Sequence, residues 1–568
     1  MNLHRLERVD LRDCPKLQSI FSLTILTSLP ELRQLMVYYC EKWEGIFCEE
    51  SLKNLSSFSS DVCFPKLWEI IIRACNKVKR LFSYSLASHC PSLERLYIED
   101  CSEIEKLVDR DSGEEAAHGD RLSLLKMKDL TLISLPKLRN IFGGEFEYQL
   151  KYPHDTHKNE NERARVVSKL CYLELQSLPE LECIWKGPTQ IISLHRLERV
   201  EVWQCPKLRS IFTLATVTSL PKLKEFEVRT CDQWEGIFCE ELLQNIYVAD
   251  STICFPTLET ITVTHCPKVK RLFSYSLASH CPSLKKITIY YCSQIEGVVQ
   301  GYKGEQVGGH DHQKLFPQLN KLNLRALPKL REIYEGYEFI QLSGTMSIQD
   351  CPSICNIPLD NSSSELEKLW LEDLGELECI WKGPTQIISL HRLEYVTLQQ
   401  CLRLRSIFTL ATVTSLPKLK RIEVTGCKEW EGIFFEKSLQ NIYANSTVCF
   451  PTLETIEIFD CSKVKRLFSY SLASHCPSLK KITIHDCSQT EGVVQGYEGE
   501  QVTGHHHQKL FPQLNKLNLI GLPKLREIYE GYEFTQLSGT MSIQDCPSIC
   551  NIPLDNSSSD LEIIKLEN

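Results

Sequence analysis

The cysteines are the residues best suited to chemistry, because 14 of the 27 recur at one position of a repeated pattern. Thiolates can bind zinc in tetrahedral clusters. Stacked repeats, however, would place these thiols in a row, and no Cys-x-x-Cys pair occurs. We therefore predict a structural role, in which each thiol points inward and bonds backbone groups at a turn. The positions are Cys14, Cys40, Cys75, Cys101, Cys205, Cys231, Cys266, Cys292, Cys351, Cys401, Cys427, Cys461, Cys487 and Cys546.

Histidine is the second candidate for chemistry. The segments GGHDHQK (308–314) and GHHHQK (504–509) could hold a metal, but the corresponding segment at 116–121 has a single histidine. We expect loops without a specific metal there. The other recurrent histidines occur in the segment LHRLE, which builds the repeat: His4, His195 and His391. No phosphate-binding loop, nucleophile elbow or zinc-protease motif occurs, so we predict no catalytic residue, no metal, no cofactor and no enzyme.

The pattern that positions these residues is L-x-x-L-x-L-x-x-C/L-x-x-L-x-x-I. Its L-x-L core alternates at period two, which is typical of a short strand with one buried face. One such unit cannot bury its own apolar face, whereas a stack of many units can. The 20 units begin at Leu6, Leu32, Leu67, Leu93, Met127, Leu170, Leu197, Leu223, Leu258, Leu284, Leu319, Leu342, Leu366, Leu393, Leu419, Leu453, Leu479, Leu514, Leu537 and Leu561.

This pattern predicts an α/β fold, a leucine-rich-repeat solenoid (horseshoe) of about 20 units. A parallel sheet is expected on its concave face, with loops and short helices on its convex face. The segments SYSLASHCPSL and TLATVTSLPKL are the expected outer helices or turns. Charged or Gly/His-rich insertions should be exposed loops; they lie at about 108–121, 149–166, 299–314 and 494–509.

A second, longer period of about 195 residues contains the short one. Residues 184–198 recur unchanged at 380–394, and residues 341–364 recur at 536–559. We infer three tandem blocks, at approximately 1–183, 184–379 and 380–568. No linker separates them, so residues 1–568 are predicted to form a single continuous array.

The bulk composition excludes several classes of protein. The formal net charge is −9, which argues against a nucleic-acid-binding surface. No stretch of about 18 apolar residues occurs, so we expect no membrane span. The first residues do not have the pattern of a signal peptide, and we expect reduced thiols and a cytoplasmic (intracellular) location.

The second and third blocks are similar enough to compare residue by residue. Their differences gather at the x positions of L-x-x-L-x-L-x, which alternate away from the buried leucines onto the concave face. The outer segment SYSLASHCPSLKKI, which we expect to be exposed, is identical in both. A variable face rich in aromatic residues and arginine is typical of protein recognition. The candidate binding residues are Tyr38, Arg73, Tyr97, Trp203, Arg229, Tyr290, Arg325, Trp370, Phe459 and His485.

The units LPKLREIYEG, LPELECIWKG, CPKLRSIF and FPTLETITVTHC resemble the leucine-rich-repeat region of plant intracellular disease-resistance proteins of the coiled-coil, nucleotide-binding class. The resemblance covers essentially the whole chain. It implies a scaffold that recognises pathogen-derived or guarded host proteins in defence and innate immunity. It also implies a nucleotide-binding domain as a partner; the phosphate loop of that domain is not found in this chain.

Two other classes of protein remain open. A substrate-recruiting adaptor of a ubiquitin ligase, of the F-box type, also uses cysteine-bearing repeats. It requires a helical module ahead of them, whereas here a repeat begins by Leu6. An extracellular receptor domain is less favoured, because neither a signal peptide nor an L-x-G-x-I-P pattern is present. The expected partner is a protein bound on the concave face.

Overall fold

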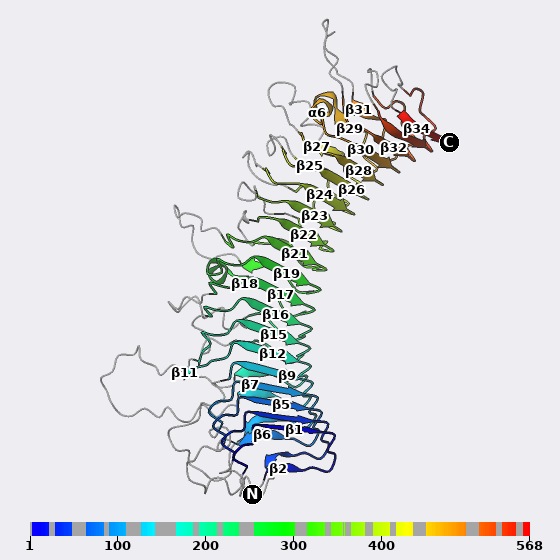
Figure 1. The fold of residues 1–568 in the computed structure, drawn as a ribbon. Coiled ribbons are helices and arrows are strands. Elements are labelled where there is room, and N and C mark those ends of the chain that lie inside the picture. Colours follow the sequence, from blue (N-terminus) through cyan, green and yellow to red (C-terminus); the bar gives the residue numbers. More distant parts are fainter. Residues whose placement is uncertain are drawn as a thin grey trace, which may run out of the picture. The chain divides into compact units, whose positions relative to one another are not determined.

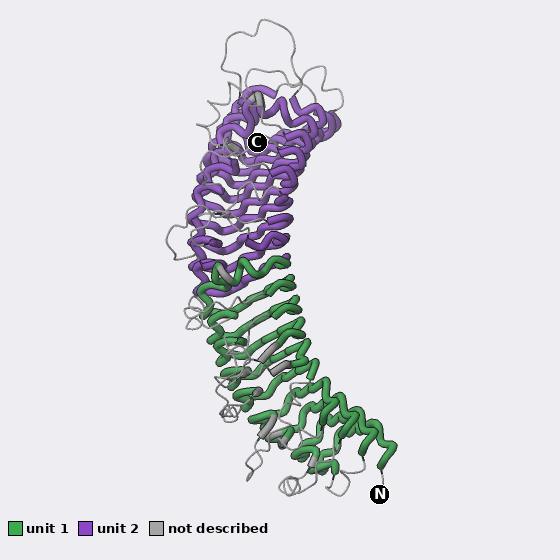
Figure 2. Tube along the Cα trace, turned by 90° about the vertical axis from the view of Figure 1, so that its left-hand side faces the viewer, with its two compact units in different colours: residues 1–284 green, residues 285–568 purple. Residues whose placement is uncertain are grey.

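The computed structural model describes residues 3–21, 29–47, 64–83, 90–109, 127–142, 166–185, 192–212, 220–237, 255–300, 315–334, 342–355, 357, 365–380, 390–408, 416–434, 450–495, 510–529, 537–552 and 561–567. The chain falls into two compact units, residues 1–284 and 285–568 (Figure 2). Each is described by itself below. That the three sequence blocks form one continuous array stays a prediction.

Each repeat contributes one strand to a parallel sheet. Unit 1 holds nine such strands in chain order: β1 (Arg8–Arg12), β3 (Gln34–Tyr38), β5 (Glu69–Arg73), β7 (Arg95–Glu99), β9 (Asp129–Ile133), β12 (Tyr172–Gln176), β15 (Arg199–Trp203), β16 (Glu225–Arg229) and β17 (Thr260–Thr264). Each of the first eight strands of unit 1 pairs with the strand of the next repeat, residue for residue.

Unit 2 repeats the arrangement with eleven strands (Figure 1). They are β19 (Lys286–Tyr290), β21 (Lys321–Arg325), β22 (Thr345–Gln349), β23 (Lys368–Glu372), β24 (Tyr395–Gln399), β26 (Arg421–Thr425), β28 (Thr455–Phe459), β30 (Lys481–His485), β32 (Lys516–Ile520), β33 (Gly539–Gln544) and β34 (Leu561–Glu567). The two units together hold the 20 predicted strands. The predicted leucine-rich-repeat solenoid with a parallel sheet is confirmed.

Alternation of side chains sets the two faces of each sheet. In β15 the second and fourth residues, Val200 and Val202, are fully buried, while Arg199 and Trp203 point the other way. Burying one such aliphatic side chain contributes about 1.5–3 kcal/mol, and each repeat supplies several. The first, third and fifth residues of the five-residue strands form what is called here the outward face; in β33, which begins one residue earlier, they are the second, fourth and sixth.

Two units depart from the predicted frame by one residue. In β22 the inward residues are Met346 and Ile348, so the frame that begins at Leu342 is L-x-x-x-L-x-L. The extra residue is accommodated at Gly344, whose φ is +120°. A Cβ atom there would lie 2.6 Å from the carbonyl oxygen of Asn320, so only glycine fits. The unit that begins at Leu537 has the same insertion.

Short strands and helices return the chain on the side away from the long strands, as Figure 1 shows for β27, β29 and α6. The helices α4 (Tyr275–Ser279) and α6 (Tyr470–Ser474) form within SYSLASH as predicted. Each is capped by a serine, and the Oγ of Ser274 accepts a hydrogen bond from the N–H of Leu277 at 3.2 Å.

Parallel pairs of two to four residues on this side were not predicted. In unit 1 they are β2 (Ser19–Phe21) with β4 (Gly45–Phe47), β6 (Arg80–Ser83) with β8 (Lys106–Asp109), β10 (Asn140–Phe142) with β13 (Cys183–Trp185), and β11 (Val166–Val167) with β14 (Ile192–Ser193). In unit 2 they are β25 (Ser406–Phe408) with β27 (Gly432–Phe434) and β29 (Arg466–Ser469) with β31 (Gly492–Gln495).

Several predicted segments lie outside the described residues. They include residues 213–219 and 409–415 of the second outer segment, the histidine-rich loops and most of the four insertions. Within the described part of the chain, no helix is long and apolar enough to cross a membrane, and no group of three metal-binding side chains occurs.

A residue in the left-handed region follows almost every long strand. The N–H of Gln204 donates to the carbonyl of Arg229 at 2.9 Å, and that of Thr230 donates to the carbonyl of Thr264 at 2.8 Å. The turn residue thus extends the sheet by one hydrogen bond. These residues are Asp13, Tyr39, Ala74, Asp100, Ser134, Ser177, Gln204, Thr230, His265, Tyr291, Ala326, Asp350, Asp373, Gln400, Gly426, Asp460, Asp486, Gly521 and Asp545.

Thr230 is the strained member of this series, because its side chain is β-branched and its φ is +54°. We expect Thr230→Gly, the residue found at the equivalent Gly426, to raise the free energy of unfolding. The left-handed region costs a non-glycine residue about 1–2 kcal/mol, and the extra backbone entropy of glycine offsets about 0.5–1 of this. Urea unfolding should therefore show a gain of about 0.5–1 kcal/mol. Thr262→Gly, in extended β17, should lose stability instead; a loss in both variants would mean that residue 230 is unstrained.

The cysteine prediction is confirmed for the described residues. All 14 predicted cysteines are free, and all but Cys14 are buried. The thiol of Cys205 donates to the carbonyl of Trp203 at 3.4 Å and reaches the carbonyl of Leu175 in the preceding repeat at 3.9 Å. Burial raises the pKa of Cys75 to about 11 and the pKa values of Cys101 and Cys351 to about 12.

Candidate protein-binding surface

All ten predicted binding residues lie on the outward faces of the two sheets. Tyr97 and Trp370 occupy the third position of their strands, and the other eight occupy the fifth. Five belong to unit 1 and five to unit 2. Because the strands of a unit pair in register, residues at one position form a row along the sheet. The parity of the L-x-L pattern therefore correctly predicted that these residues lie opposite the buried side chains; that they bind a partner stays a prediction.

In unit 1, predicted binding residues contact one another as pairs of a cation and an aromatic ring. The guanidinium of Arg73 lies 4.6 Å from the ring centroid of Tyr97, and that of Arg229 lies 5.3 Å from the centroid of Trp203. The hydroxyl of Tyr97 donates to Glu99 at 2.8 Å. Burial and this carboxylate raise the pKa of Tyr97. Each cation–π contact is worth about 0.5–1 kcal/mol at such exposed sites and holds the rings in place.

Sequence reasoning missed an acidic cluster in the middle of this face. Glu174, Glu201 and Glu227 occupy the third positions of three consecutive strands. The hydroxyl of Tyr172 donates to Glu174 at 3.0 Å and lies 3.1 Å from a carboxylate oxygen of Glu201. Arg199 contacts Glu201 as well, and Arg229 contacts Glu227. The signal was a glutamate at the middle x of L-x-L in three consecutive repeats, and the search considered aromatic and arginine residues there but not glutamate.

Unit 2 presents a different surface. Trp370 is 42% exposed, the most exposed tryptophan of the described residues. The ring of Phe459 lies 6.1 Å from that of His485 on the next strand. Beside Trp370, the ammonium of Lys368 lies 5.2 Å from the ring centroid of Tyr395. Partly exposed aromatic side chains of this kind are the residues that dominate protein interfaces.

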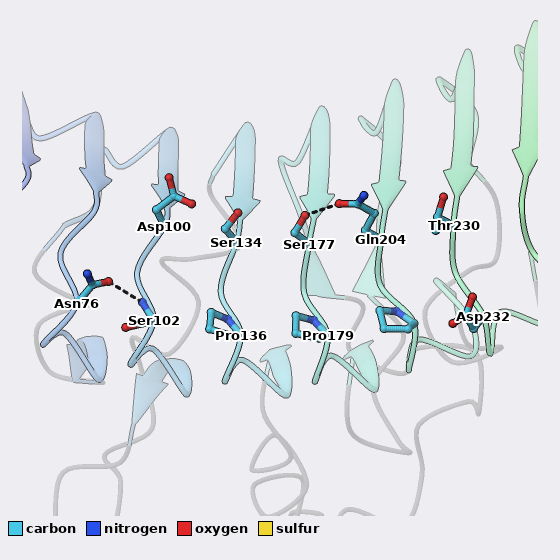
Figure 3. A pocket seen from close by; sticks show the side chains of 11 residues that line it. Asn76, Asp100, Ser102, Ser134, Pro136, Ser177, Pro179, Gln204, Thr230 and Asp232 are labelled. Atoms are coloured by element: carbon cyan, nitrogen blue, oxygen red, sulfur yellow. Dashed lines mark hydrogen bonds between the residues drawn. The ribbon is translucent and has the colours of Figure 1, made fainter.

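A groove in unit 1, also missed, follows the carboxyl ends of the strands (Figure 3). Its volume is about 710 Å³. The hydroxyl of Ser177 donates to the side chain of Gln204 at 2.7 Å, and the N–H of Ser102 donates to Asn76 at 3.2 Å. Left-handed turn residues, prolines and the polar residues that replace proline in other repeats line it: Asn76, Asp100, Ser102, Ser134, Pro136, Ser177, Pro179, Gln204, Pro206, Thr230 and Asp232. Such hydroxyl, amide and carboxyl groups can bind polar ligands.

One expectation behind the candidate surface is wrong. The outer segment SYSLASHCPSL is not exposed throughout, because Leu277, Ala278 and Cys281 are buried. Its identity between the copies therefore does not measure drift on an exposed surface. Exposed lysines on turns are a better comparison: Lys268 and Lys270 are unchanged at the equivalent positions 463 and 465. The comparison between the variable outward face and the conserved exposed surface therefore depends on these two lysines and not on SYSLASHCPSL.

The repeated strand, the inward leucines and the buried cysteine or leucine at the turns define a leucine-rich-repeat protein. The profile of the family described as "Plant disease resistance protein RPS2-like, leucine-rich repeats" matches residues 48–154, 145–232, 239–359, 355–428 and 435–562. The chain belongs to this family, as the sequence resemblance implied.

Curated relatives from Arabidopsis thaliana carry matching names. The putative disease resistance protein At4g10780 is 26% identical over 42% of this chain and 29% of its own length. The probable disease resistance protein At1g61300 is 29% identical over 38% of this chain and 21% of its own length. The match thus spans less than a third of either relative. These names support a scaffold related to disease resistance.

Solved structures with similar repeats have low sequence identity. The leucine-rich-repeat domain of the type III effector XopL is 18% identical, with 44% of this chain and 64% of that chain covered and a TM-score of 0.23. A leucine-rich repeat protein from Bacteroides ovatus is 13% identical, with 83% and 91% covered and a TM-score of 0.23. Neither structure bears on the function of this chain.

Proposed function

We propose that the chain is a recognition scaffold of a plant immune receptor, which binds a pathogen-derived or guarded host protein on its outward face. The observation that carries the proposal is the set of half-exposed aromatic and arginine side chains that each unit presents on the outward face of its in-register strands. Tyr97, Trp203 and Trp370 combine a large contact area with few rotatable bonds. The family of the chain supports a role in disease resistance.

The proposal places the scaffold in the cytoplasm, with a nucleotide-binding domain as a second partner. It assigns no catalytic residue to the chain, since leucine-rich repeats of this kind are typical interaction scaffolds. A ubiquitin-ligase adaptor would use the same surface to recruit a substrate. The two functions predict different results, because a ubiquitin-ligase adaptor would shorten the lifetime of the protein that it binds and an immune-receptor scaffold would not.

The test of the proposal is cross-linking from defined positions. A photoreactive amino acid at position 370, expressed with the full chain in leaf cells, should capture a protein partner. The same amino acid at Lys268, which is exposed on a turn, is the matched control and should not capture it. Once the captured partner is identified and purified, Trp370→Ala should weaken its binding to the chain by about thirtyfold, as expected for an exposed aromatic anchor.

Exchange between copies provides a second control. Arg199→Tyr with Glu201→Thr and Trp203→Gln introduces the residues found at Tyr395, Thr397 and Gln399, so the buried Glu201 is not left without Arg199. Thermal unfolding should hardly change, whereas binding that depends on unit 1 should fall. Capture from position 268 and not from position 370, with silent exchanges on the outward face, would place recognition elsewhere.

A further inference from the structure

A basic patch interrupts the outward face of unit 2 at its first three strands. Lys286, Thr288 and Tyr290 point outward from β19, and Lys321, Asn323 and Arg325 point outward from β21. The outward residues of β22 are Thr345, Ser347 and Gln349. These nine positions contain three basic residues and no acidic residue. Lys286, Lys321 and Arg325 are called the basic patch below.

The positive charges of the basic patch are uncompensated. Lys286 and Lys321 lie directly opposite each other on neighbouring strands, where like charges destabilise a sheet. Within the described part of unit 2, neither lysine forms an ion pair, and neither does Arg325. In unit 1 the equivalent pair is Arg95 with Asp129, joined at 3.3 Å. An acidic residue of the neighbouring strand therefore neutralises the positive charge at this site in the first block, whereas none does so in the second block.

A buried hydroxyl beside the patch also lacks a partner among the described residues, as does that of Thr483 at the equivalent site of the third block. Thr288 is only 5% exposed, and its Oγ1 makes no hydrogen bond with any described residue. A buried hydroxyl without a partner is destabilising, as an uncompensated charge is. Asn323, which is 8% exposed, lies opposite it on β21. One anionic ligand would relieve both costs, since a carboxylate accepts hydrogen bonds from a hydroxyl and from ammonium groups.

We propose that the basic patch binds an acidic segment of the partner protein, with Lys286, Lys321 and Arg325 pairing carboxylates and Thr288 donating a hydrogen bond. This rests on recognition by the outward face, proposed above. The nine outward positions without an acidic residue span three strands, about 10 Å across. The next strand, β23, carries Glu372 at its fifth position. This width suits a few carboxylates and not the continuous phosphate track of a nucleic acid.

The third block provides a matched control. Lys481 and Lys516 lie opposite each other in the same way, but Lys481 already pairs with Glu457 at 2.5 Å. The charge at this second site is therefore partly neutralised. The same substitution can be made in both places, Lys321→Asp and Lys516→Asp, and only the first should affect the proposed site.

The experiment measures fluorescence anisotropy with the full chain. The probe is a fluorescein-labelled peptide of alternating glutamate and serine, and its glutamine counterpart is the control peptide. We expect Lys321→Asp to weaken binding of the glutamate peptide by about tenfold, because it replaces a positive charge by a negative one and pairs Lys286 internally. Arg325→Ile, which introduces the residue found at Ile520, and Thr288→Val should each weaken it several-fold. Lys516→Asp should change it less than twofold.

Folding is monitored separately. Lys321→Asp reproduces the Arg95–Asp129 arrangement, so its melting temperature should equal or exceed that of the wild type. Equal binding of the two peptides, or equal loss in both lysine variants, would overturn the proposal. Tighter binding of a single-stranded oligonucleotide than of the peptide would assign the patch to nucleic acid instead. If position 370 captures a partner but the glutamate peptide does not bind, the proposed function stands. Only the proposal that the basic patch binds an acidic segment is then overturned.

Discussion

Leu398→Asp should lower the free energy of unfolding of unit 2 by about 4 kcal/mol or more, the range reserved for a charge buried without a partner. Leu398 is the fourth residue of β24 and has no exposed surface. It lies in register between Leu371 and Val424 of the adjacent strands, so no polar group is available to the new carboxylate.

The loss should spread to neighbouring repeats, because each repeat is stabilised mainly by the two beside it. Hydrogen exchange should show reduced protection in β23, β24 and β26 together. Gln399→Asp, one residue along on the outward face, is the control and should change stability by less than about 0.5 kcal/mol. Similar unfolding midpoints for the two variants would contradict the inward orientation of Leu398.

Alkaline pH should destabilise the protein through its buried thiols. The folded-state pKa of Cys101 is raised from the usual 9.0 to about 12 by burial, and that of Cys75 is raised to about 11. A thiol that keeps its proton in the folded state contributes stability that is present below pH 9. This stability is lost as the pH rises, because the unfolded chain ionises first. Each such thiol should cost about 1.4 kcal/mol per pH unit above pH 9, up to its folded-state pKa.

A single substitution isolates this effect from the titration of lysine and tyrosine. Leucine occupies the position of Cys101 in the next repeat, at Leu135, so Cys101→Leu is compatible with the repeat. Between pH 9 and 11, under reducing conditions, its stability should fall less steeply than that of the wild type by about 1.4 kcal/mol per pH unit. Parallel curves for the two proteins would show that the thiol does not ionise on unfolding.

Features of the fold with a local cause could be predicted from sequence. Period-two alternation placed Val200 and Val202 inward and Trp203 outward, and it needed no knowledge of the neighbouring repeat. The burial of the recurrent cysteines, all but Cys14, followed from their fixed distance to the last strand leucine. The burial of Leu277 and Ala278 did not, because it depends on how the outer segment packs against the repeat.

Features that depend on two repeats at once could not be predicted. The three-residue strands such as β25 are too short to show alternation and are ordered by pairing with β27. The contact between Arg73 and Tyr97 requires the register between β5 and β7. The segment that joins two neighbouring strands varies in length along the chain, so the sequence alone does not give this register. The groove at the strand ends depends on the left-handed turn residues, and these include Asp, Ser, Gln and Thr, types with no shared signature.

The in-register pairing of strands has a consequence for the inheritance of this protein. Within each unit the loops between strands differ in length, yet Leu371, Leu398 and Val424 meet at the same level. Recombination between the near-identical second and third blocks of the gene would thus add or remove whole strands and leave the others aligned. A single recombination event can thus produce a new combination of outward residues, and no compensating substitution in the core is needed.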